Sequence, residues 1–245
     1  MVDWIGGQAR RFIDWITRPM ELGEIGFSPS GIARGDELHV LVGTQGEVIK
    51  IDKEGIPLGP TVSPFPSPVV DSTIVGNRWC GIWMDRELRQ AGMAAIPLNE
   101  VWEDGPTREQ LRTFPSINGD FLKPAMSIWH RTLDSEPMKV GVSGENIVFA
   151  TVTGLYMIDS DANEVWRGML PRWPEISNVF AFDQIVGILE IPEGISIWSK
   201  AGGVSVLDHS NGLEIYSKTI QFGDKVSGVS YSEEGGWLVM LHEGS

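Results

Sequence analysis

Acidic side chains are the residues of this sequence that most readily suggest chemistry. Glu24, Asp71 and Asp183 each lie on or beside a segment with the pattern of a β-strand. If those strands surround a common centre, the carboxylates converge there, and a pair of them can act as the acid and the base or nucleophile of a glycoside hydrolase. The alternative, which the sequence favours, is that each Asp caps a turn or holds neighbouring sheets together.

The histidines and the single cysteine form no recognisable reactive set. His39, His130, His209 and His242 have no metal-ligand spacing with one another or with Cys80. The apolar neighbours of Cys80 predict a buried thiol. The sequence contains neither a phosphate-binding Gly-rich loop with its Lys nor a Gly-x-Ser-x-Gly motif. We therefore expect neither a metal nor a cofactor.

The β-strands that carry these residues can be predicted from a sequence motif that occurs three times. Each copy is an apolar stretch that ends in Asp, followed by a short polar turn and a second apolar stretch. The copies are Gly46–Asp52, Gly154–Asp159 and Gly203–Asp208. We expect the closing Asp of each copy to accept backbone hydrogen bonds in the turn. The pattern predicts strand, turn and strand, repeated along the chain.

The repeats occur at a roughly regular spacing. The first strands of successive sets begin near residues 25, 69, 138, 178 and 226. A four-stranded propeller blade takes roughly 40–50 residues, which matches every interval but the second. The longer interval contains an insertion, Asn99–Ala125, which is acidic, rich in Pro and Gly, and predicted to hold one helical turn at Thr107–Phe114.

Two segments carry a family resemblance. Ser67-Pro68-Val69-Val70-Asp71 resembles the inner-strand opening of quinoprotein-type (PQQ-like) propellers, and Gly154–Gly168 resembles the outer half of such a blade. The resemblance implies blade architecture without a specific function, since these repeats occur in scaffolds, receptors and enzymes alike. It implies neither a functional residue nor the quinone cofactor.

The predicted fold is all-β: a single β-propeller domain over residues 20–245 with five four-stranded blades. Six blades, with an irregular one inside Asn99–Leu133, is the alternative. The last set has only two strands, Val226–Tyr231 and Trp237–Leu241. Strands at Val2–Ile5 and Arg11–Ile16 in the N-terminal segment, residues 1–19, would complete that blade.

A second interpretation of the N-terminal segment stays open. The apolar residues Trp4, Phe12 and Trp15 fall on one side of a helical wheel, opposite Arg10 and Arg11. Such a helix would leave the last blade incomplete, and a partner strand or a second copy of the chain could then complete its edge. The helix would pack on the protein itself or dock on a partner; contact of residues 1–18 with a membrane surface is the less favoured outcome.

Composition narrows the classes of partner. The chain has 33 acidic and 19 basic residues and a net charge of -14. This charge repels phosphate backbones, so we expect no nucleic-acid partner. The chain has one cysteine, no apolar run long enough to span a bilayer and no signal-peptide pattern, and we therefore expect a cytoplasmic protein.

Aromatic residues in predicted loops suggest a binding surface. Trp102 lies in the insertion, and Trp173 follows Arg172 in another predicted loop. Interfaces favour Trp and Arg, so these three residues, with Trp4 and Trp15, are the predicted contacts. Trp173→Ala should then leave folding intact. The sequence thus predicts a non-catalytic scaffold that binds protein, and the alternative is a carbohydrate-binding or glycoside-hydrolysing propeller.

Overall fold

The computed structural model describes residues 25–113, 122–124, 126–177 and 183–242. Nearly all regular structure in these ranges is β-strand, with the two short helices α2 (Arg108–Thr113) and α3 (Pro174–Ser177). The prediction of an all-β chain is therefore confirmed. Neither helix has the length or the apolar character needed to cross a membrane.

The strands of the described ranges form five antiparallel sheets, and in each sheet the strands are numbered from the innermost to the outermost. The first contains β1 (Pro29–Arg34), β2 (Leu38–Gly43) and β3 (Val48–Asp52), and the second β4 (Val69–Val75), β5 (Arg78–Asp85), β6 (Gln90–Pro97) and β7 (Trp129–Leu133). The third contains β8 (Pro137–Ser143), β9 (Asn146–Thr151), β10 (Gly154–Ile158) and β11 (Glu164–Gly168). The fourth contains β12 (Ile185–Ile191), β13 (Gly194–Ser199), β14 (Gly203–Leu207) and β15 (Glu214–Thr219), and the fifth β16 (Val226–Ser232) and β17 (Gly236–Leu241).

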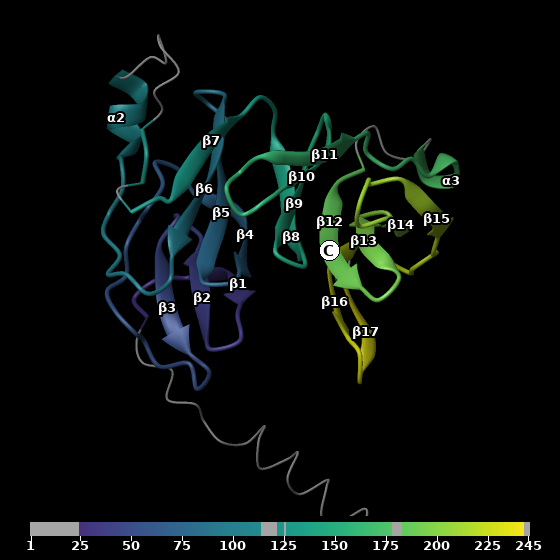
Figure 1. The fold of residues 1–245 in the computed structure, drawn as a ribbon, viewed down its shortest axis with the longest axis horizontal. Coiled ribbons are helices and arrows are strands. Elements are labelled where there is room, and N and C mark those ends of the chain that lie inside the picture. The colour runs from purple at the N-terminus through teal and green to yellow at the C-terminus, as the bar shows by residue number, and fades with distance from the viewer. Residues whose placement is uncertain (1–24, 114–121, 125, 178–182, 243–245) are drawn as a thin grey trace, which may run out of the picture.

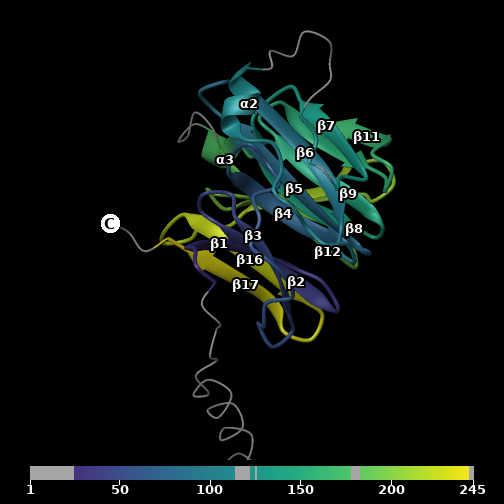
Figure 2. The same ribbon diagram turned by 90° about the vertical axis from the view of Figure 1, so that its left-hand side faces the viewer.

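The sheets follow one another in chain order along an arc, as the blades of a β-propeller do (Figure 1). The inner strands β1, β4, β8, β12 and β16 pack side by side in that order, and Figure 2 shows β4, β8 and β12 from the side. Among the described residues, this strand packing does not continue to the same extent from β16 back to β1. Three buried apolar clusters fill the spaces between the first four sheets.

The repeated turns form as predicted. Oδ1 of Asp52 accepts the backbone N–H groups of Glu54 and Ile56 at 3.0 and 2.7 Å. Asp159 and Asp208 accept backbone N–H groups in the two later copies. Hydrogen bonds, first of all from the side chains of Asn163 and Ser210, lower the pKa of these two carboxyls. The prediction that each closing Asp is structural is therefore confirmed.

The first and second blades differ from the prediction. In the first blade the inner strand begins at Pro29 rather than near residue 25, and Ile56–Leu58 makes a single bridge, between Pro57 and Ile51, instead of a full strand. Pro57 has no N–H to donate, which limits pairing there.

In the second blade the fourth strand, β7, comes from the far side of the insertion and pairs with β6. Trp129–Leu133 is therefore the fourth strand of the second blade and does not belong to an extra one.

Of three other predicted segments, one is confirmed and two lie outside the described residues. The helical turn expected at Thr107–Phe114 is confirmed as α2. The N-terminal segment, residues 1–19, and the strand expected at Val179–Phe182 lie outside the described residues.

The inner strands approach one another closely where glycine replaces a side chain. A Cβ added to Gly141 on β8 would lie 2.4 Å from the carbonyl oxygen of Ile188 on β12. A Cβ on Gly187 of β12 would lie 2.1 Å from Cγ2 of Val229 on β16. Both distances are shorter than van der Waals contact, so these two glycines set the spacing of three neighbouring inner strands.

Gly141→Ala should therefore destabilise the protein. The added methyl group meets backbone that cannot move without separating two blades, and overpacking of this kind costs about 1–3 kcal/mol. Urea unfolding followed by tryptophan fluorescence measures the free energy of unfolding. Gly168→Ala on β11 is the matched control, because a Cβ there meets no atom within 4 Å. Equal stability of the two variants would contradict the proposed constraint.

Candidate functional site

The five inner strands line a central cavity of about 480 Å³. Asp71, one of the predicted channel carboxylates, lies in its wall on β4. Oδ1 of Asp71 lies 2.7 Å from Nζ of Lys139, and its Oδ2 accepts the backbone N–H of Val140 at 2.9 Å. Both partners belong to β8, so the carboxylate links two blades and its charge is balanced by the Lys139 ammonium group.

The other predicted carboxylates do not join Asp71 in this cavity. Asp183 lines a separate cavity of about 410 Å³ together with Met138 and Leu170, and its Oδ1 accepts the N–H of Ala201 at 3.1 Å. Glu24 lies outside the described residues. A glycoside hydrolase needs two carboxyl groups on either side of one bond. Asp71 and Asp183 line different cavities, so these two carboxylates do not form the predicted pair.

A serine, a histidine and a glutamate that no sequence motif marks meet between blades. Oγ of Ser143 lies 2.7 Å from Nδ1 of His209, and Oε1 of Glu190 lies 3.9 Å from the same nitrogen. A nucleophilic triad requires the serine and the acid at opposite ring nitrogens of the histidine. In this cluster both face Nδ1. Glu190 also accepts the N–H of Gly144 at 3.0 Å, so the cluster holds the third and fourth blades together.

The described residues contain no group of three or more His, Cys, Asp or Glu side chains that could hold a metal ion. Cys80 is buried, and burial raises the pKa of its thiol.

The first part of the insertion is fixed to the first two blades. Trp102 is only 2% exposed, and its Nε1 donates to the carbonyl oxygen of Pro97 at 2.8 Å. Nζ of Lys50 on β3 donates to the carbonyl oxygens of Leu98 and Glu100 and lies 5.2 Å from the centre of the Trp102 ring. Burial lowers the pKa of this lysine. This first part of the insertion therefore packs against the blades.

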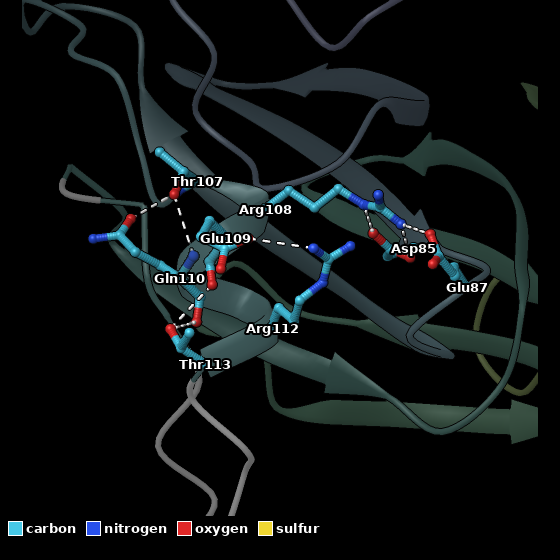
Figure 3. Close-up of polar contacts among 8 residues, drawn as sticks. All are labelled: Asp85, Glu87, Thr107, Arg108, Glu109, Gln110, Arg112 and Thr113. Atoms are coloured by element: carbon cyan, nitrogen blue, oxygen red, sulfur yellow. Dashed lines mark hydrogen bonds and ion pairs between the residues drawn. The ribbon is translucent and has the colours of Figure 1, made fainter.

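A polar cluster fixes helix α2 to the β5–β6 turn (Figure 3). Nε of Arg108 donates to Oδ2 of Asp85 at 2.6 Å, and the same guanidinium binds Glu87. Asp85 is 3% exposed and also accepts hydrogen bonds from Ser67 and from the N–H of Leu88. The Arg108 guanidinium is the largest cause that lowers the pKa of Asp85 from 3.8 to about 2.

The predicted contact residues divide into buried, exposed and undescribed ones. Trp102 and Trp173 are 2% and 4% exposed and belong to the core, so the expectation that they lie on accessible loops is wrong. Trp173 packs face-on against Gly203, where an added Cβ would lie 2.3 Å from the indole ring. Arg172 is exposed. Trp4 and Trp15 lie outside the described residues.

Exposed apolar side chains instead occur on β11 and on and just before β15, the outermost strands of the third and fourth sheets. We call Val165, Leu213, Ile215 and Tyr216 the outer apolar patch; their exposed fractions run from 46% to 68%. Trp166 of β11 contacts the turn between β14 and β15: its Nε1 donates to the carbonyl oxygen of His209 at 3.1 Å, and its ring packs close to Gly212. No sequence signal distinguished these residues, because apolar residues are equally expected on a strand that another strand covers.

Loss of the Arg108 side chain should destabilise the protein in a pH-dependent manner. Arg108→Ala leaves a buried carboxylate without its cation, at a cost of about 1–3 kcal/mol at pH 7. The folded pKa of Asp85 lies below its ordinary value, so the stabilisation is present above that value and disappears as the pH falls. We therefore expect the gap in urea-unfolding free energy to shrink between pH 4 and pH 2.

Arg112→Ala is the control for this experiment, since Arg112 pairs only with the exposed Glu109 at 3.4 Å among the described residues. Its effect should stay below about 0.5 kcal/mol. A constant gap for Arg108→Ala across this pH range would show that Asp85 is not the group involved.

Trp173→Ala should destabilise the fold strongly, because it leaves a large cavity in the cluster around β13 and β14. Removal of a buried Trp side chain costs about 3–5 kcal/mol. The adjacent Arg172→Ala is the matched control and should lie within about 0.5 kcal/mol of the unchanged protein. Calorimetry of the three proteins checks this expectation. Similar unfolding temperatures would show that Trp173 does not belong to the core.

Comparison with known proteins agrees with the architecture. No sequence family matches the chain, and no curated protein sequence matches it either. Among solved structures, it is similar to the Cps50 (Swd1) β-propeller domain of Myceliophteria thermophila, with 12% identity, a TM-score of 0.58, and coverage of 87% of this chain and 62% of that one.

Two further solved structures show the same likeness. One is the computationally designed protein Ika8, with 12% identity, a TM-score of 0.54, and coverage of 87% of this chain and 58% of that one. The other is BBS1N, solved in complex with ARL6DN, with 10% identity, a TM-score of 0.53, and coverage of 86% and 57%. The chain thus spans about three fifths of the length of these three structures. At such identities the likeness shows the fold alone, and that fold is a β-propeller.

Proposed function

We propose that this protein is a β-propeller scaffold that binds another protein through its outer apolar patch. The observation that carries the proposal is the exposure of four apolar side chains on β11 and on and just before β15, Leu213 at 68% among them. Exposed apolar surface is a common feature of protein-binding sites. Tyr216 adds an aromatic side chain, a residue type that interfaces favour.

The polar groups of the inner strands support the same conclusion. Asp71 accepts hydrogen bonds from Lys139 and Val140, and Glu190 accepts one from Gly144. These hydrogen bonds join neighbouring blades. The anchored first part of the insertion joins the first two blades in the same way. A rigid platform with accessible side chains on its outside suits recognition, since little order is lost when a partner binds.

One structural neighbour is consistent with protein recognition. BBS1N was solved in complex with a second protein, ARL6DN. We extend to this chain only the general role of protein recognition. The identity of the partner is a matter for experiment.

A double variant, Leu213→Lys with Ile215→Lys, should weaken partner binding about tenfold or more, because it puts two charges into the contact surface. Affinity capture with cross-linking and mass spectrometry identifies the partner, and titration of the purified partner measures the loss. Ile56→Lys with Leu58→Lys is the matched control, because these side chains are 57% and 49% exposed on the outside of the first blade.

Partner binding that is equally strong in both double variants would reject the outer apolar patch as the site. Binding of the unchanged protein to a glycan array, lost in Asp71→Asn, would instead support the carbohydrate alternative.

A further inference from the structure

We draw no further inference here: the strongest candidate, the unpaired apolar edge of β17 in the fifth sheet, carries none, because nothing among the described residues shows what covers it.

Discussion

The close approach of the inner strands is the constraint on which the rest of this structure depends. Gly141 lets β8 reach the backbone of β12, and Gly187 lets β12 reach β16. Once the strands are this close, Asp71 on β4 can bind both Lys139 and the backbone of Val140 on β8. The same geometry brings Ser143, Glu190 and His209 together. The polar groups near the centre are therefore consequences of blade packing, and this explains why they resemble reactive sets without having the required arrangement.

The fold was predictable where local chemistry decides it. The Asp that closes each repeated strand, as in Asp52 and Asp159, has one favourable role in a tight turn, and the structure shows that role. Apolar strands between such turns specify blades at a spacing near that of four strands. The fourth strand of the second blade was not predictable in this way, because β7 pairs with β6 across the whole insertion and nothing near Trp129 marks its partner.

The candidate site was less predictable than the fold. Trp102 and Trp173 looked like surface residues because both lie in segments predicted as loops. Burial depends on distant segments: Trp102 lies under Lys50, and Trp173 lies on Gly203. Conversely, Leu213 and Ile215 looked like ordinary strand residues, and only the absence of a covering element among the described residues exposes them. A single sequence shows which residues are apolar but does not show which surfaces remain uncovered.

The route of the chain through the second blade also affects how the protein can change over time. The chain leaves the blade after β6 at Pro97 and returns to it as β7 at Trp129, while Trp102 and Arg108 fasten the first part of the excursion. The closure entropy of a loop grows slowly with its length, by about 0.6 kcal/mol for each doubling. The connection between β6 and β7 can therefore vary in length at little entropic cost, provided that the packing of Trp102, Arg108 and the buried Leu111 is kept. The fold thus offers a position where new sequence can be accommodated while the blade that carries it stays intact.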